Sequence, residues 1–286
     1  TFDELMPLVK TSMLHSARSQ SNRRKLCLYH QLQGKRRIAA PLTLPVPKSD
    51  AERAEYHISN DLLGVGTPRE RYARNIRAIT TLKKWSRTPA GNATGAGRTC
   101  SICWLGWLSD CFDERNSHYA ELKALLSDDE YEAARESTLT AFYTPPVVIR
   151  SMYQVLERLG FQRGNILEPS CGVGNFIGMR PDNLSDSKIY GVELDSISGR
   201  IAQQLYQNRL SLFVGLKKQI AGQLFDAAIG NVPFGSFKIV DKRYDKYNFL
   251  IHDYFFARTM DKVRPGGIIA FITSKGTMDK ENPSVR

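Results

Sequence analysis

The sequence has few cysteines, no long apolar run and no phosphate-binding P-loop, and each absence excludes a class of protein. Its five cysteines are odd in number and irregularly spaced, so we expect a reducing cytoplasm rather than a disulfide framework. No uncharged apolar run reaches the roughly 18 residues of a membrane span, and no basic start precedes an apolar stretch at the N-terminus. We therefore expect neither membrane insertion nor secretion. The absence of a Gly-x4-Gly-Lys-Ser/Thr segment excludes a helicase motor from this chain.

One group of cysteines has the spacing of a possible metal site. Cys100-x-x-Cys103 is followed by Cys111 and His118, which together offer four zinc ligands. A structural zinc site usually has a second tight ligand pair, whereas the third and fourth candidates here are scattered. We therefore predict free thiols and no metal.

The composition is that of a globular protein with an uneven charge. The 286 residues are 42% hydrophobic and 24% charged, which is sufficient for a buried core. Residues 1–100 carry 18 Lys/Arg against 7 Asp/Glu, which equals the whole net charge of +11. Clusters at 23–25 and 35–37 attract polyanions, so a nucleic acid is the expected partner. A solvated basic arm is a compatible alternative.

Composition changes along the chain predict three regions. Residues 1–50 are expected to form a basic, flexible arm or linker that ends in a proline-rich stretch, and residues 51–139 a helical region with a flexible loop at 86–99. Residues 140–286 are expected to form the α/β core. Because the chain does not begin with Met, we expect it to be an excised fragment.

The hydrophobic pattern predicts alternating strands and helices. Strands are expected at 165–168, 188–193, 210–214, 226–230 and 268–273. Before the glycine turn, helices are expected at 51–84 (Ile76, Ile79 and Leu82 on one face), 119–126 and 127–135 (after a Ser127/Glu130 capping box). Another is expected to start within Thr144-Pro145-Pro146 and to end at Gly160, with Val148, Met152, Val155, Leu156 and Leu159 at helical spacing. Later helices are expected from Asn175, at 195–205 (capped by Asp195 or Ser196, with Ile197, Ile201 and Leu205 on one side) and at 249–263, before a turn at 264–267. This alternation predicts a doubly wound, mostly parallel sheet, which binds ligands beyond the carboxyl ends of its strands.

The first functional motif is a glycine turn after the strand at 165–168. Gly172 and Gly174 allow a tight turn and close approach of a ligand to the backbone. Glu168 ends the first strand, and Glu193 ends the second, where an acid binds ribose hydroxyls in doubly wound folds. A nicotinamide enzyme would use the same acid but normally has a third glycine, whereas Ile177 stands at that position. A simple packing turn is the other alternative.

The second motif, Asn231-Val232-Pro233-Phe234, has the groups needed to bind a planar amine. The Asn231 oxygen and the Val232 carbonyl can accept the two amine hydrogens, which directs the nitrogen lone pair towards an incoming methyl group. Pro233 would fix the bend, and Phe234 would stack on the base after it leaves the duplex. An Asx-type turn without chemistry is the structural alternative.

These motifs resemble those of the N6-adenine DNA methyltransferases, which are class I enzymes that use S-adenosylmethionine. The segments at 141–146, 168–176, 191–195 and 231–235 carry the resemblance. Those at 251–256 and 263–267 resemble, more narrowly, the methylase module of large helicase–methylase proteins of phages and conjugative elements.

The resemblance implies S-adenosylmethionine as cofactor, DNA as substrate and a helicase region in the same parent polypeptide. The cofactor would lie among Tyr143, Thr144, Glu168, Pro169, Gly172, Gly174, Phe176, Glu193 and Leu194, and the target amine would contact Asn231, Val232, Pro233 and Phe234.

The sequence departs from the family at several points, so other functions stay open. Val232 replaces the commoner first proline, residues 215–218 replace an acid near the cofactor adenine, and the sheet is expected to be truncated after its fifth strand. One alternative is an amine methyltransferase that acts on RNA or protein. Another is a catalytically weak module that binds DNA or S-adenosylmethionine within a larger anti-restriction or mobile-element protein.

Overall fold

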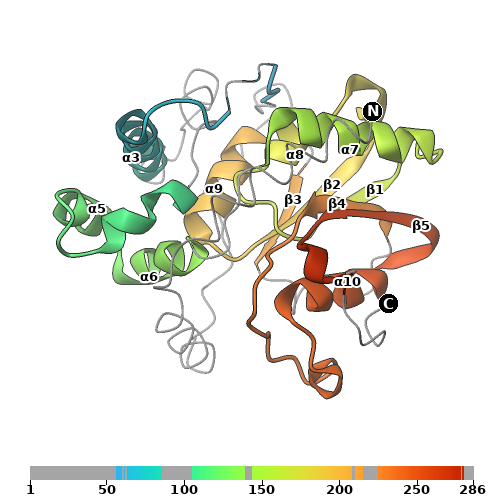
Figure 1. The fold of residues 1–286 in the computed structure, drawn as a ribbon. Helices are drawn as coiled ribbons and strands as arrows, with labels where there is room; N and C mark the ends of the chain where they lie inside the picture. Colours follow the sequence, from blue (N-terminus) through green and yellow to red (C-terminus); the bar gives the residue numbers. More distant parts are fainter. Residues whose placement is uncertain are drawn as a thin grey trace. The chain divides into compact units, whose positions relative to one another are not determined.

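The computed structural model describes residues 56–59, 61, 63–85, 105–138, 144–207, 210–214, 225–277 and 279. Its elements are α3 (Pro68–Trp85), the 3-10 helix η2 (Leu105–Phe112), α5 (Tyr119–Leu125), α6 (Asp128–Ser137), α7 (Pro146–Arg158), β1 (Asn165–Glu168), α8 (Asn175–Gly178), η3 (Asp182–Leu184), β2 (Lys188–Glu193), α9 (Ser196–Leu205), β3 (Leu210–Val214), β4 (Phe225–Asn231), η4 (Asp245–Tyr247), α10 (Ile251–Met260), β5 (Val263–Ile272) and η5 (Lys275–Thr277) (Figure 1). No helix of these described ranges is both long and apolar enough to cross a bilayer.

The five described strands form one parallel sheet in the order β3-β2-β1-β4-β5. The order reverses between β1 and β4, as in doubly wound folds, so the carboxyl ends of these two strands flank the expected ligand crevice. Register places Glu168 beside Gly191 of β2, and Leu167 beside Ala228 of β4. The predicted α/β fold class is confirmed.

Helices cover both faces of the sheet. β2 and β3 lie on one side of β1, whereas β5 lies on the far side of β4. Crossovers between parallel strands are right-handed, so the helices of the two halves are placed on opposite faces. Figure 1 shows α8 and α9 on one face and α10 on the other.

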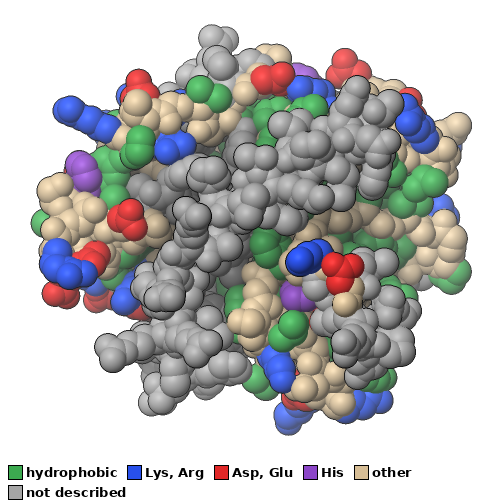
Figure 2. All heavy atoms as spheres, viewed as in Figure 1, with side chains coloured by type: hydrophobic (Ala, Val, Ile, Leu, Met, Phe, Trp, Pro, Cys, Tyr) green, Lys and Arg blue, Asp and Glu red, His purple; other side chains and the backbone are tan. Residues whose placement is uncertain are grey.

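One hydrophobic core joins the helices that precede the sheet to the sheet itself. Ile79 of α3, Leu122 of α5, Ile149 of α7, Ile166 of β1 and Ile201 of α9 belong to this cluster, and all five are fully buried. Over the outer surface of α3, α5 and α6, Lys/Arg and Asp/Glu side chains are intermingled (Figure 2). Apolar contacts therefore connect these helices to the sheet, while charges face solvent.

Most predicted boundaries agree with the structure, and the capping predictions are confirmed. Ser127 and Glu130 form a capping box at α6, and Asp195 caps α9 by accepting hydrogen bonds from two backbone amides. Ile197, Ile201 and Leu205 line one buried side of α9, as predicted.

Three elements differ from their predictions. α3 begins at Pro68 rather than near residue 51, because Gly64 and Gly66 adopt positive φ just before the Thr67/Glu70 cap. α10 starts two residues later than predicted and ends at Met260. The turn predicted at 264–267 lies inside β5. Phe225 of β4 pairs with Val263 and Ala227 pairs with Ile268, so four residues of β5 stand opposite a single residue of β4 and the register is irregular there.

The buried face of α7 also differs from its prediction. Val155 and Leu159 are exposed, whereas Ile149, Tyr153 and Leu156 are buried. Tyr153 is not among the predicted apolar positions but belongs to the core, where its hydroxyl donates to the Phe176 carbonyl at 2.8 Å. The helix start at Pro146 and the left-handed Gly160 at its end agree with the prediction.

Several predictions concern residues outside the described ranges. These are the basic arm at 1–50, the loop at 86–99, Cys100, Cys103, Tyr143 and the segment 215–218.

Candidate functional site

The two sequence motifs meet at the carboxyl edge of the sheet. Glu168 ends β1, Glu193 ends β2, and Asn231 ends β4. β1 lies between the other two strands, and a Cβ added to Gly230 would lie 3.5 Å from Cγ of Glu168. The acidic groups, the glycine turn and the bend at 231–234 therefore share one edge, at the point where the strand order reverses.

The glycine turn is built from two left-handed residues with different surroundings. Gly172 has φ +55°, and no atom of the described residues lies within 4 Å of the position that a Cβ would take. Gly174 has φ +85°, and a Cβ there would lie 2.5 Å from the ring of Tyr206. The Cys171 amide donates to the Val192 carbonyl at 2.9 Å, which holds the turn against the end of β2. One glycine thus faces open space, and the other rests on the core.

The carboxylate of Glu193 organises the same turn. It accepts hydrogen bonds from the backbone amides of Gly172 at 2.7 Å, Leu194 at 2.9 Å and Asp195 at 2.8 Å. Burial and repulsion from Asp195 raise the pKa of Glu193 to about 7, although the backbone hydrogen bonds act in the opposite direction. A carboxylate has about four acceptor positions and three are taken here, so about one remains for a ligand hydroxyl.

Glu168 is the most buried acid at this edge. Its side chain is enclosed, with 1% of the residue exposed, and its Oε2 atom has no hydrogen-bond partner among the described residues. Burial, with a smaller contribution from the charge of Glu193, raises the pKa of Glu168 well above its usual range. A buried acceptor of this kind is costly unless a ligand satisfies it, so Glu168 is a candidate ligand-binding group.

The bend at 231–234 is tied to the segment before α7. The Asn231 carboxamide nitrogen donates to the Thr144 hydroxyl at 3.0 Å, across 87 positions of sequence. This bond orients the carboxamide, with its oxygen on the opposite side of the group. The Val232 amide donates to the Ile272 carbonyl at 3.2 Å, and the Val232 side chain is buried. The bend is thus fixed on both sides. Asn231 as a whole is partly exposed, whereas its Oδ1 atom is buried.

The other predicted site residues have varied surroundings. Pro233 and Phe234 are partly exposed on the bend, and Leu194 is 46% exposed next to Glu193. Pro169 is buried in the turn. Phe176 is 3% exposed and belongs to the hydrophobic core. Its predicted contact with a cofactor stays a prediction.

Sequence reasoning missed the residues that support the glycine turn from below. Tyr206, at the end of α9, packs its ring against Gly174 and its hydroxyl group against Gly178. The Ile58 amide donates to the Gly178 carbonyl at 2.8 Å, and the Tyr56 amide donates to the Leu205 carbonyl at 2.9 Å. Tyr206, Ile58 and Tyr56 lie in no sequence motif, and only folding of the chain brings them to the glycine turn.

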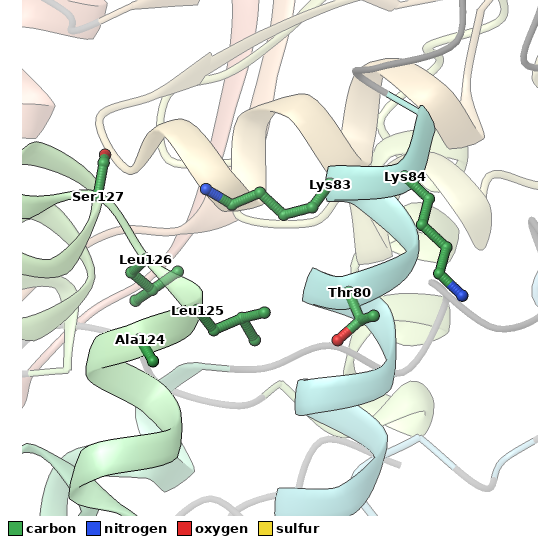
Figure 3. Close-up of a pocket in the computed structure, with 7 residues that line it drawn as sticks. All are labelled: Thr80, Lys83, Lys84, Ala124, Leu125, Leu126 and Ser127. Atoms are coloured by element: carbon green, nitrogen blue, oxygen red, sulfur yellow. The ribbon is translucent and has the colours of Figure 1, made fainter.

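Two cavities lie away from this edge. The larger, of about 380 Å³, lies between the end of α3 and the α5–α6 connection, and Thr80, Lys83 and Ser127 contribute to its lining. Figure 3 shows Lys83 extending towards that connection and Lys84 pointing away from it. Lys83 forms an ion pair with Glu130. None of the residues that line this cavity belongs to the two sequence motifs.

Two of the four possible zinc ligands, Cys111 and His118, lie in the described part of the chain. Cys111 is a buried free thiol, and His118 stacks on Tyr72 with ring centroids 3.9 Å apart. Among the described residues, no group of three or more His, Cys, Asp or Glu side chains is arranged to hold a metal ion.

Two curated proteins are similar to this chain in sequence. Defense against restriction protein B of Escherichia phage P1 is 29% identical over 168 residues, which is 57% of this chain and 7% of that protein. Type II methyltransferase M.CvrRI of Paramecium bursaria Chlorella virus XZ-6E is 37% identical over 94 residues, which is 32% of this chain and 24% of that protein. The matches thus span less than a quarter of each relative. No protein-family model matches the chain.

Solved structures are more distant. A protein of Listeria monocytogenes assigned to the class I S-adenosylmethionine-dependent methyltransferases is 15% identical, with a TM-score of 0.42 over 74% of this chain and 76% of that chain. The O-methyltransferase of Bacillus cereus is 17% identical, with a TM-score of 0.33 over 58% of this chain and 78% of that chain. These scores are too low to support an argument about this chain. The predicted resemblance to methyltransferases and to a large phage protein is confirmed by the sequence matches, and the strand order agrees with it.

Proposed function

We propose that this chain transfers a methyl group from S-adenosylmethionine to the N6 amine of adenine in DNA. The observation that carries the proposal is the hydrogen bond between Asn231 and Thr144, which ties the bend at 231–234 to the segment before α7, on the carboxyl edge of the sheet that also carries the glycine turn. The sequence similarity to a viral Type II methyltransferase supports a DNA substrate.

The residues at this edge fit the proposed cofactor. S-adenosylmethionine, when bound, supplies an electrophilic methyl group on a positively charged sulfur. The open space at Gly172 would admit it, and the Glu193 carboxylate would accept a hydrogen bond from a ribose hydroxyl. The buried Oε2 atom of Glu168 would face its positively charged methionine portion.

The bend at the end of β4 would prepare the target amine for methylation. Conjugation with the ring makes this nitrogen a weak nucleophile. Hydrogen bonds from the amine to the Asn231 oxygen and the Val232 carbonyl would localise its lone pair, and Thr144 would hold the carboxamide in the required orientation. Phe234, which is partly exposed, would stack on the extruded base. Positioning would supply most of the rate, since no strong base is required.

The proposal is tested by transfer of tritium from labelled S-adenosylmethionine to DNA, RNA and protein. We expect label on N6 of adenine in DNA, and loss of that label in Asn231→Ala. The matched control is Asn183→Ala, because Asn183 is exposed and its described hydrogen bond is to the acid Glu157 on the surface. Label on RNA or protein instead of DNA, or cofactor binding without any transfer, would overturn the proposal.

The partners of a longer parent protein are also proposals. The chain matches only 7% of the phage protein, so a helicase region in the same polypeptide stays a prediction. The division into an arm, a helical region and a core at residues 50 and 139 stays a prediction as well.

A further inference from the structure

The segment that follows the catalytic bend forms a closed loop at the rim of the site. The Ile251 amide donates to the Phe237 carbonyl at 2.9 Å, which joins the two ends of this 238–250 loop. Phe237 is buried, and its ring occupies the space beside Gly235, where a Cβ would lie 2.8 Å from it. Since Gly235 directly follows the bend at 231–234, the base of the loop is attached to the amine-binding motif. Figure 1 shows the loop as the orange trace between β4 and α10.

Internal hydrogen bonds give this loop a defined shape. Asp241 accepts from the Arg243 amide at 3.2 Å and from the Tyr254 hydroxyl at 2.9 Å. The Asp245 carboxylate accepts from the Asp241 amide at 2.7 Å. Tyr244 is buried and packs edge-to-face on Tyr254 of α10. Both acids of the loop are therefore engaged within the fold, and the loop is anchored to a core helix.

The outer part of the loop presents an aromatic ring among cations. Tyr247 is 53% exposed and stacks on Phe249, with centroids 5.1 Å apart and 13° between the ring planes. The ammonium of Lys246 lies 4.8 Å from the Tyr247 ring centroid, and Asn248, at φ +57°, accepts a hydrogen bond from Lys238. Blue side chains surround the part of the view in Figure 2 where Figure 1 places this loop.

The chemistry of this surface matches a nucleic acid. Lys242 and Lys246 are exposed and form no ion pair with any residue that the structure describes. Ammonium groups of this kind bind phosphates with release of counterions, whereas an exposed aromatic ring stacks on unpaired bases of any sequence. A nucleic acid carries phosphates and bases on the same molecule, so it would match the ring and both cations at once. The combination therefore favours DNA.

We propose that the 238–250 loop binds duplex DNA beside the target adenine. Lys242 and Lys246 neutralise backbone phosphates, and the ring of Tyr247 stacks on a base that loses its neighbour when the target leaves the helix. This inference rests on the proposed function and assigns the surface that holds the substrate next to the amine-binding bend.

The cation part is tested by fluorescence anisotropy of a labelled mixed-sequence DNA duplex, titrated with the full chain at several salt concentrations. For Lys242→Gln/Lys246→Gln we expect the slope of log K against log salt to become shallower by about 1.8, since each phosphate contact contributes about 0.9. The control is Arg158→Gln/Arg163→Gln, which removes two exposed cations next to the amino end of β1. A slope equal to that of the control would overturn the proposal.

The aromatic part is tested with a duplex that contains a single unpaired base. Tyr247→Ala should weaken binding of this duplex by about 5- to 150-fold, whereas Tyr247→Phe should bind nearly as well as the parent because stacking is retained. Equal binding by both variants would contradict the stacking role. Tighter binding of an RNA duplex than of DNA would overturn the choice of partner.

A parallel methyl-transfer assay separates failure of this inference from failure of the proposed function. If the parent chain labels no DNA but the salt slopes differ as expected, the proposed function fails and the DNA-binding loop is upheld. If the parent chain labels DNA while the loop variants bind and react like the control, the loop assignment alone fails.

Discussion

The two glycines of the turn provide a matched pair of substitutions whose effects should separate folding from cofactor binding. Both Gly172 and Gly174 have positive φ, so alanine at either position adopts a left-handed conformation that costs about 1–2 kcal/mol. Alanine also restricts the unfolded chain, which offsets this by about 0.4–1 kcal/mol. These two contributions are common to both variants.

The surroundings of the added methyl group make the difference. At Gly174 it would lie 2.5 Å from the ring of Tyr206, which is fully buried and cannot move aside without disturbing the core. Overpacking of this kind costs about 1–3 kcal/mol. At Gly172 the methyl group would meet no described atom within 4 Å. Gly174→Ala should therefore be less stable than Gly172→Ala by about 1–3 kcal/mol.

Urea unfolding followed by circular dichroism measures the difference in stability, and calorimetry measures S-adenosylmethionine binding. We expect Gly172→Ala to be less stable than the parent by at most about 1.6 kcal/mol but to bind the cofactor at least about tenfold more weakly, because its methyl group enters the proposed cofactor space. Equal stability of the two variants would refute the packing argument. Full cofactor affinity in Gly172→Ala would refute the location of the cofactor.

The remaining predictions concern charge and hydrogen bonding. Because the pKa of Glu193 is raised to about 7 in the folded chain, its contribution to stability should fall as pH rises from about 4.5 to 7, and Glu193→Gln should flatten that part of a pH series of urea unfolding curves. Cofactor affinity should instead fall below pH about 7, as protonation removes an acceptor, and calorimetry showing no such fall would contradict the role of Glu193. Thr144→Val should lower kcat by about 2- to 12-fold with little change in cofactor affinity, since it releases the Asn231 carboxamide; an unchanged kcat would contradict this. Glu130→Ala should destabilise the chain by about 2–4 kcal/mol because it leaves two largely buried cations unpaired and removes the α6 capping box, whereas the exposed Asp129→Ala should change thermal stability little.

Local sequence patterns predicted the regular elements well where burial of an apolar run or a local capping hydrogen bond determines the structure. β1 and β2 agree residue for residue with their predicted ranges, because short apolar runs between turn residues have few alternatives. Caps at Ser127 and Asp195 follow from side-chain chemistry within four residues of the chain. Predictions failed where distant residues decide. Tyr153 became a core residue through its bond to the Phe176 carbonyl, which no local pattern reveals.

The candidate site divides in the same way. The sequence alone determined the types of residue at the strand ends, namely two acids, two glycines and an amide followed by proline and an aromatic ring, because the chemistry of a strand end and a turn is local. Only the tertiary structure decided that Thr144 holds Asn231, that Tyr206 supports Gly174, and that the 238–250 loop turns an aromatic ring and two cations outward. These contacts join positions far apart in the chain, and they form only when the parallel sheet brings its carboxyl ends to one edge.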